Sequence, residues 1–263
     1  NYIKDAADDF IVQFGTKETN PDNRHPWYRE SYVSGAGGYM SNGFMHKLKD
    51  EKGMEDPRLR YYLYRQSLTN PVNTASNTIL PCEGNADYLY CYVGDFYWGR
   101  DHGDDEGIPN DNSLRTAFGV YPAGGAFDDG STNSTTTTSS NLGGAGIYPI
   151  WLSSFTKFML AESSLPSPAG LGTLGTPLTY LTAAMGDSFT KVATFSGVAM
   201  DAAEVSAYVA YVTNEYTTAA TDSDKLAIVM REYYIAMWGN SVEAYNNYRR
   251  TGFPSLQGSV ITP

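Results

Sequence analysis

The 263-residue sequence lacks the features that mark several large classes of protein. No run approaches the roughly 18 to 20 consecutive apolar residues of a transmembrane helix, so we expect no membrane span within it. Its 18 Lys and Arg against 29 Asp and Glu give a net charge of −11, which argues against binding to nucleic-acid phosphates. Only three histidines occur, and GxSxG, HExxH and P-loop motifs are missing, so no familiar catalytic machinery is recognisable.

The amino terminus also lacks the marks of a translation start. Asn1 stands where an initiator Met would be, and neither the basic region nor the apolar core of a signal peptide follows it. We therefore expect a mature form or a fragment, with any membrane attachment outside this segment.

Cysteine is scarce, because only Cys82 and Cys91 are present, in a segment whose Pro81 and Gly84 predict a loop or a hairpin. In an exported protein the two could form a disulfide that contributes roughly 2 to 3 kcal/mol. In a reducing compartment they would stay thiols. A zinc site is disfavoured because no CxxC motif or second Cys/His pair accompanies them.

What the sequence does contain is typical of a globular protein. Hydrophobic residues make up 41% and charged residues 18%, and the length suffices for one large domain. Aromatic residues reach 14%, with 21 Tyr to 11 Phe. Rings with a hydroxyl suit half-wet surfaces as well as cores, so this composition favours a binding protein.

Two regions differ in character within a chain that we expect to be mostly α. Residues 1–148 are rich in Gly, Pro, Asn and Tyr and predict an irregular, loop-rich region with short strands, whereas residues 149–263 predict helical hairpins. A Thr/Ser tract at 131–141 predicts a flexible surface loop at the boundary. We expect the two regions to form one continuous structural unit.

Four helices are predicted in the second region. A helix of about 15 residues should follow Pro149, which suits a first helical turn, and a second should open at Pro177. Asp201 resembles the start of a capping box and predicts a third helix. The last should run from near Asp222 until Gly252 and Pro254 stop it. Its apolar face comprises Leu226, Val229, Met230, Tyr233, Met237 and Trp238. Such helices would make two hairpins like those of tetratricopeptide repeats.

The first region gives weaker signals. Residues 2–10 could be the end of a helix, and residues 41–49 predict a short capped helix. The aromatic-rich segment at 88–98 is suited to a strand or a hairpin.

The carboxy-terminal stretch reads WGN at 238–240 and EAYNNYRRTGFP at 243–254. It resembles the closing motif of the SusD/RagB family. Further segments that look like one branch of SusD-like proteins are RHPWY at 24–28, DPRLRYY at 56–62, YWGRDHGDDEGIP at 97–109, YPAGG at 121–125 and FMLAE at 158–162. The resemblance covers nearly all of the chain.

This resemblance implies a mostly helical SusD-like fold with tetratricopeptide-like hairpins. It also implies a lipid anchor, a place on the outer-membrane surface, and partnership with a SusC-like TonB-dependent transporter. The implied function is non-catalytic capture of oligosaccharide or polysaccharide nutrients. A carrier of peptides or other oligomers is the alternative, and a glycoside hydrolase a more distant one. Family members are usually longer than this chain, so we expect the anchor and part of the binding surface to lie upstream of Asn1.

An acidic segment lies within one of these motifs. Asp101, Asp104, Asp105 and Glu106 offer enough carboxylate oxygen to coordinate calcium, although the EF-hand spacing is missing. A solvated acidic loop satisfied by Arg100 and backbone amides is the other interpretation. Glycosidase chemistry needs two carboxyl groups facing each other across a sugar, which adjacent residues rarely achieve.

Aromatic residues beside these acids are candidates for sugar contact, because ring faces stack on sugars while polar groups bind hydroxyls. The candidate ligand-binding residues are Trp98, Tyr97, Tyr92, Trp27, Tyr28, Asn110 and Asn112. Aromatics of this kind also build cores, so both roles stay open.

The paired arginines of the closing motif predict a structural role. Arg249 and Arg250 lie where the helix dipole is negative and loose carbonyls need donors. We expect Arg249→Ala to cost stability and not ligand affinity.

Overall fold

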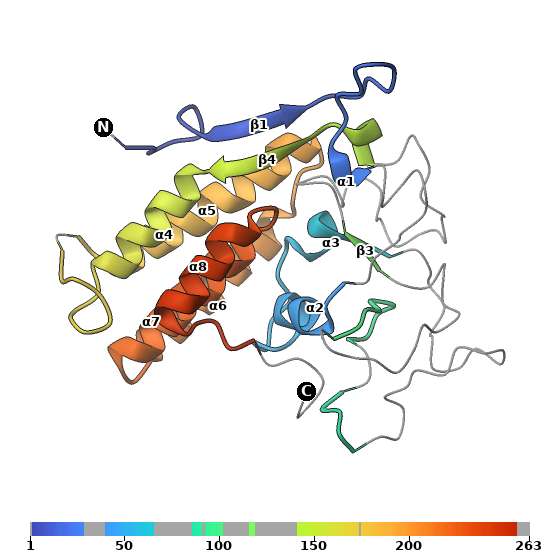
Figure 1. Cartoon of the computed structure of the whole chain (residues 1–263). Coiled ribbons are helices and arrows are strands. Elements are labelled where there is room, and N and C mark those ends of the chain that lie inside the picture. The colour runs from blue at the N-terminus through green and yellow to red at the C-terminus, as the bar shows by residue number, and fades with distance from the viewer. Residues whose placement is uncertain are drawn as a thin grey trace. The chain divides into compact units, whose positions relative to one another are not determined.

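A computed structural model of the chain describes residues 2–28, 40–65, 86–90, 93–101, 116–118, 141–173 and 175–256 (Figure 1). Contacts divide the chain into two compact units. Unit 1 comprises Asn1–Gln13 and Ile147–Ser255, and unit 2 comprises Phe14–Gly146 and Leu256–Pro263. No helix among the described residues is long and apolar enough to cross a membrane.

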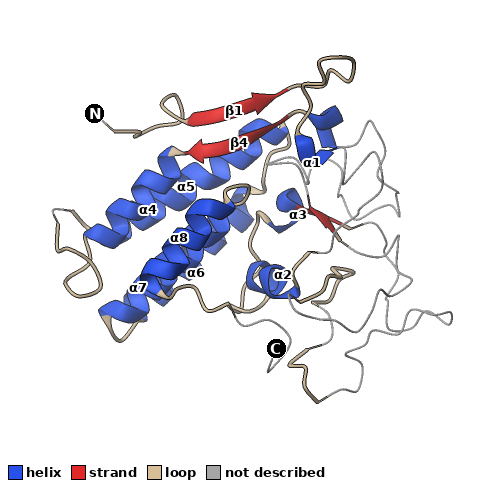
Figure 2. Cartoon of the chain, viewed as in Figure 1, coloured by secondary structure: helices blue, strands red, loops and turns tan. Residues whose placement is uncertain are grey.

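Unit 1 holds the long helices, which lie side by side in Figure 2, and confirms the mostly helical fold class. They are α4 (Ser153–Ser163), α5 (Pro177–Ser196), α6 (Ala202–Thr218), α7 (Asp222–Ala236) and α8 (Ser241–Thr251). Strands β1 (Phe10–Phe14) and β4 (Gly146–Trp151) pair as a two-stranded sheet, drawn as arrows of opposite direction in Figure 2.

The predicted starts of α5, α6 and α7 are confirmed, and local caps explain them. Pro177 occupies the first turn of α5, where a missing N–H costs nothing. Asp201 accepts hydrogen bonds from the N–H groups of Ala203 and Glu204 at the start of α6. Thr221 and Asp224 form a reciprocal capping box at α7.

The first predicted helix starts later than expected. Pro149 and Trp151 belong to β4, and α4 begins only at Ser153. The N-cap residue Leu152 has no capping side chain, and the first residues of α4 are buried, so a group from another segment must accept a hydrogen bond from the helix start. Asp9 accepts a hydrogen bond from the Ser153 N–H at 2.7 Å, across 144 residues of sequence.

The prediction of one continuous last helix is wrong, because the chain forms α7 and α8 with a turn between them. Gly239 takes a φ of +88°, which is unfavourable for other residues. Asn240 caps α8 by accepting from the Glu243 N–H at 3.1 Å. Its side-chain amide also donates to the carbonyls of Pro149 and Ile150 at 2.9 and 3.1 Å, which fixes the turn against β4.

The expected helix end at residues 2–10 is also wrong. Turns precede β1, whose backbone is extended from Phe10 onward. Asp9 explains why this segment lies along the helices. Its carboxylate meets the start of α4 and also pairs with Lys191 of α5 at 2.7 Å.

Aromatic rings fill the core of unit 1. Phe158 of α4 stacks on Tyr233 of α7 with centroids 5.1 Å apart and planes 12° apart. Phe189 of α5 meets the Tyr208 ring of α6 edge-on at 5.8 Å. All four rings are buried, so the apolar stripes predicted from helical spacing do face one another.

A buried carboxylate joins α6 to α7. Glu232 is fully buried and accepts hydrogen bonds from the Tyr208 hydroxyl at 2.8 and 3.0 Å. Arg231 donates to Glu232 and to Glu215 of α6. Burial opposes the charge of Arg231, but the neighbouring Glu232 and Glu215 outweigh it and raise the pKa of the guanidinium. The network therefore keeps its charges paired inside the bundle.

The elements of unit 2 among the described residues are short. They are α1 (Pro26–Tyr28), α2 (Asn42–Lys49), α3 (Leu59–Tyr62), β2 (Leu63–Tyr64) and β3 (Ala117–Phe118). Strands β2 and β3 are antiparallel, with Leu63 opposite Phe118. The predicted helix at 41–49 is confirmed, with Ser41 as its N-cap.

A buried ion cluster lies in the DPR motif of unit 2. Arg58 donates to both oxygens of Asp56 at 2.8 and 2.7 Å, and Lys52 donates to one at 3.1 Å. Asp56 and Arg58 are 0% exposed. Burial alone would raise the pKa of Asp56, but the two cations hold it far below its ordinary value. This motif therefore has a structural role.

Candidate functional site

Three of the predicted sugar-binding rings lie inside unit 2. Tyr28, Tyr97 and Trp98 are 0%, 4% and 2% exposed. Trp98 is tied to Thr116 by two hydrogen bonds of 2.8 Å, one to the Thr116 hydroxyl and one from the Thr116 N–H. The guanidinium of Arg65 lies 5.0 Å from the centre of the Tyr97 ring. These rings present little surface on which a sugar could stack.

A tight turn explains how Tyr97 reaches the interior. Asp95 and Phe96 have φ values of +49° and +68°, and the Tyr97 N–H bonds to the Gly94 carbonyl at 3.0 Å. Positive φ at both central residues is the geometry of a hairpin turn. Residues 94–97 thus form a hairpin-type turn within the segment for which the sequence predicts a strand or a hairpin.

Trp27 differs from its neighbours because its side chain is open to solvent. It is 43% exposed, and the backbone N–H of Trp27 donates to Nδ1 of His25 at 3.2 Å. The His25 ring is buried between Phe14 and Trp27, with edge-on contacts at 4.8 and 5.9 Å. Burial lowers the pKa of His25 to about 4, so the imidazole is neutral at pH 7 and can accept this bond. His25 therefore contacts both the backbone and the exposed ring of Trp27.

The acidic segment is represented by Asp101 alone. Its side chain is half-buried, and it lies near Tyr90, whose pKa is raised chiefly by burial and further by Asp101. Within the described ranges, no three His, Cys, Asp or Glu side chains gather as a metal site would require. The remaining predicted site residues lie outside the described residues: Tyr92, Asn110, Asn112, Asp104, Asp105, Glu106, Cys82 and Cys91.

The closing motif ties α8 to the bundle, as its structural interpretation predicts, but through Arg250. The guanidinium forms a two-pronged ion pair with Glu162 of α4, with Nη2 to Oε2 at 2.8 Å. The same Nη2 donates to Asn247 at 2.8 Å. Arg249 instead lies over the exposed Tyr245 ring at 5.7 Å. The stability loss predicted for Arg249→Ala stays a prediction, and these contacts lead us to expect a larger loss for Arg250→Ala.

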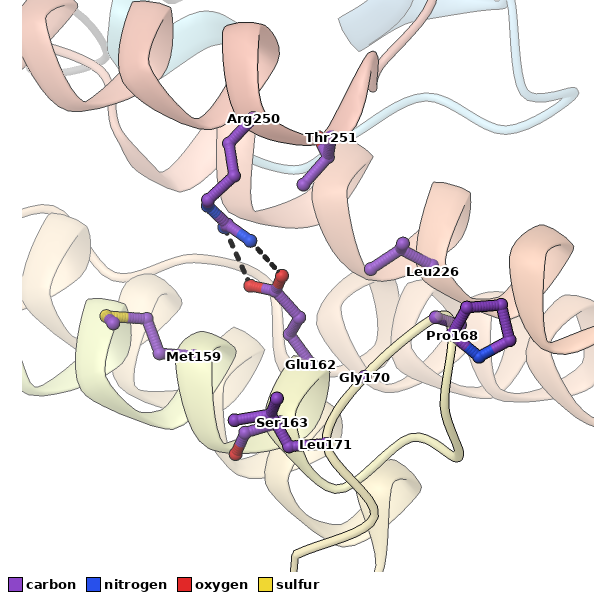
Figure 3. Close-up of a pocket in the computed structure, with 10 residues that line it drawn as sticks. Met159, Glu162, Ser163, Pro168, Gly170, Leu171, Leu226, Arg250 and Thr251 are labelled. Carbon is purple, nitrogen blue, oxygen red and sulfur yellow. Dashed lines mark hydrogen bonds and ion pairs between the residues drawn. The ribbon is translucent and has the colours of Figure 1, made fainter.

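A pocket of about 540 Å³ opens beside this ion pair, within unit 1 (Figure 3). Its walls come from α4, the loop at 164–173, α7 and α8. The lining residues are Met159, Glu162, Ser163, Pro168, Ala169, Gly170, Leu171, Leu226, Arg250 and Thr251.

Sequence reasoning missed this pocket, although two of its residues lie in quoted motifs. Glu162 ends the FMLAE segment and Arg250 lies in the closing motif. Their 88-residue separation gives no sign that they pair. Leu171 lies in a loop that carries no periodic signal.

The family model described as Susd and RagB outer membrane lipoprotein matches residues 179–261. Among curated proteins, no sequence matches.

Solved structures match nearly the whole chain in fold. A SusD homolog from Bacteroides fragilis NCTC 9343 has a TM-score of 0.58 and 16% identity, over 98% of this chain and 49% of that chain. A second SusD homolog from the same strain has a TM-score of 0.56 and 15% identity, over 96% of this chain and 46% of that chain. A Bacteroidetes AC2a SusD-like protein has a TM-score of 0.59 and 15% identity, over 95% of this chain and 52% of that chain. The chain thus spans about half the length of these structures, at 46 to 52%.

These findings confirm the resemblance to the SusD/RagB family. The family's sequence pattern is found in α5–α8 and the residues that follow, and the SusD-like fold extends over almost all of the chain.

Proposed function

We propose that this chain is part of a carrier on the surface of the bacterial outer membrane, which binds glycan oligomers and delivers them to a SusC-like TonB-dependent transporter. Attachment would use a lipid anchor, as the description of the family implies. The carrier would leave the glycan chemically unchanged. The observation that carries this proposal is the SusD-like fold over 98% of the chain together with the family match at 179–261.

Within the described residues, Trp27 is the predicted aromatic best suited to meet a sugar. A sugar ring stacks its apolar C–H face on a flat aromatic surface, which requires that surface to be open to solvent. Trp27 is 43% exposed, whereas the Trp98 ring is 2% exposed. The buried imidazole of His25 contacts the Trp27 ring edge-on, with centroids 5.9 Å apart, which reduces the side-chain entropy that the indole would lose when a ligand binds.

A binding screen of the full-length protein against polysaccharides and oligopeptides tests this function. Trp27→Ala should weaken glycan affinity by roughly fivefold, which corresponds to about 1 kcal/mol of lost stacking. Trp27→Phe should lose less. Leu89→Ala is the matched control, since Leu89 is a 59% exposed apolar residue of the same unit. Trp98→Ala is a poor test, because removing a buried ring would destabilise the unit.

The outcomes separate the alternatives. Binding to oligopeptides alone would contradict the glycan proposal and favour the peptide carrier. Unchanged glycan affinity in Trp27→Ala would remove Trp27 from the site but leave the carrier intact. Steady release of reducing ends from a bound glycan, lost in Asp104→Asn, would indicate a hydrolase.

Calcium binding by Asp101, Asp104, Asp105 and Glu106 stays a prediction. Isothermal titration of the metal-free protein with calcium chloride should give saturable heat, and Asp101→Asn should weaken the binding. A titration without heat, repeated at two temperatures, would end the calcium hypothesis.

A further inference from the structure

The pocket of unit 1 has the size and walls of a small-molecule site. Its volume of about 540 Å³ falls within the roughly 300 to 1,000 Å³ typical of ligand pockets. Met159, Pro168, Leu171 and Leu226 give it aliphatic and thioether walls. Met159 and Leu171 are 44% and 78% exposed, so a ligand would cover apolar surface that now meets water.

The loop that forms one wall is held in place before any ligand arrives. The N–H groups of Leu171 and Thr173 donate to the Ser163 carbonyl at 3.1 Å, and Gly172 donates to Leu165 at 2.8 Å. Gly170 lies so close that a Cβ there would be 2.3 Å from the Glu162 carbonyl. A pocket fixed by backbone contacts requires little ordering when a ligand binds.

The charges at the pocket are already balanced. Glu162 and Arg250 lie at its edge and face each other in Figure 3 as a two-pronged pair. Glu162 would repel a carboxylate ligand, and Arg250 would repel an ammonium ligand, so either ligand would have to disturb the ion pair. Three of the five guanidinium N–H groups bond to Glu162 and Asn247, which leaves two donors for a neutral acceptor.

The pocket offers no surface for stacking a sugar. None of its ten lining residues is aromatic. An aliphatic body fits these walls better than a flat ring or a polyhydroxylated one, because few polar groups here could pair with many hydroxyls.

We propose that this pocket binds a small uncharged amphiphile, with its aliphatic part between Met159, Leu171 and Leu226 and one neutral acceptor group against Arg250. The site is distinct from the glycan contact proposed at Trp27 and belongs wholly to the helical unit. Unit 1 would thus bind a ligand different from the glycan.

Three probes with the same six-carbon skeleton test the charge argument: hexanamide, hexanoate and hexylamine. The protein is titrated with each while the methyl groups of Met and Leu are followed by NMR. Hexanamide should shift the signals of Met159, Leu171 and Leu226 saturably. The other two should bind at least tenfold more weakly.

Two variants locate the site, and both change exposed side chains that the fold does not need. Leu171→Ser and Met159→Gln should each weaken hexanamide binding by at least threefold, read at the methyl groups that remain. Val242→Ser is the matched control, since Val242 is 59% exposed on α8 and does not line the pocket. Melting curves of all three variants establish that the fold persists.

Three results would overturn the proposal. One is the lack of any saturable shift with hexanamide up to its solubility limit. Another is equal affinity for all three probes, which would refute the charge argument. The third is unchanged hexanamide affinity in both Leu171→Ser and Met159→Gln, which would place binding elsewhere. Glycan affinity is measured on the same samples, so that failure here is distinguished from failure of the carrier function.

Discussion

Replacing Asp56 by Asn should destabilise unit 2 far more than its modest change in size suggests. The carboxylate accepts four hydrogen bonds: from the Arg58 N–H, from Nε and Nη2 of Arg58, and from Nζ of Lys52. Asn keeps one acceptor oxygen but turns an amide group toward two cations that remain buried. Breaking a buried ion pair in this way costs about 3 to 5 kcal/mol. Since Asn preserves the shape of the side chain, we expect the free energy of unfolding to fall by about 3 kcal/mol, the lower end of this range.

Asp95→Asn is the matched control. It removes the same charge from an ion pair in the same unit, but the Asp95 side chain is 69% exposed in its pair with Lys49. Exposed pairs contribute roughly 0 to 1 kcal/mol. Asn also tolerates the positive φ of +49° at this position. We expect a loss below about 0.5 kcal/mol.

Urea denaturation followed by Trp fluorescence measures both variants, and its pH dependence adds a second test. The folded pKa of Asp56 lies far below the unfolded value of about 3.9. Its contribution is therefore complete above roughly pH 4 and is lost as the pH falls toward the folded pKa. The stability gap between the native chain and Asp56→Asn should shrink below that pH. Equal losses in Asp56→Asn and Asp95→Asn at pH 7 would refute this reasoning.

Two further predictions concern unit 1. Arg250→Ala should lower the free energy of unfolding by about 1 to 2 kcal/mol, because it removes a partly exposed two-pronged pair with Glu162. Arg249→Ala should lower it by less than about 0.5 kcal/mol. Equal melting temperatures of the two variants would contradict this prediction. Asp9→Ala should cost about 1 to 2 kcal/mol through loss of the α4 cap, and amide hydrogen exchange at Ser153 should speed up. Unchanged exchange there would mean that Asp9 does not cap α4.

Local signals sufficed where a helix carries its own cap. The start of α5 follows from Pro177, whose missing N–H costs nothing in a first turn, and the starts of α6 and α7 follow from side-chain caps at Asp201 and Thr221. The apolar stripes follow from the period of the helix. The family resemblance likewise rests on short motifs, whose residues are neighbours along the chain.

The division between α7 and α8 had a signal that helical periodicity concealed. Met237 and Trp238 continue the spacing of the α7 stripe, which favoured one long helix. Gly239 followed by Asn240, with Glu243 three residues later, has the pattern of a stop and a new N-cap. The hydrogen bonds from the Asn240 side chain to the β4 carbonyls hold the turn between the two helices, and they join residues about 90 positions apart.

The amino-acid sequence was enough to predict the starts of α5, α6 and α7, the mostly helical class and the family resemblance, because these depend on residues that are neighbours along the chain. The exposure of adjacent rings, such as exposed Trp27 and buried Tyr28, depends on packing and could be read only from the folded chain. Only the folded chain also shows that Asp9 caps α4 and that Glu162 meets Arg250 beside a pocket. Each of these depends on segments far apart in sequence, whose meeting no local pattern encodes.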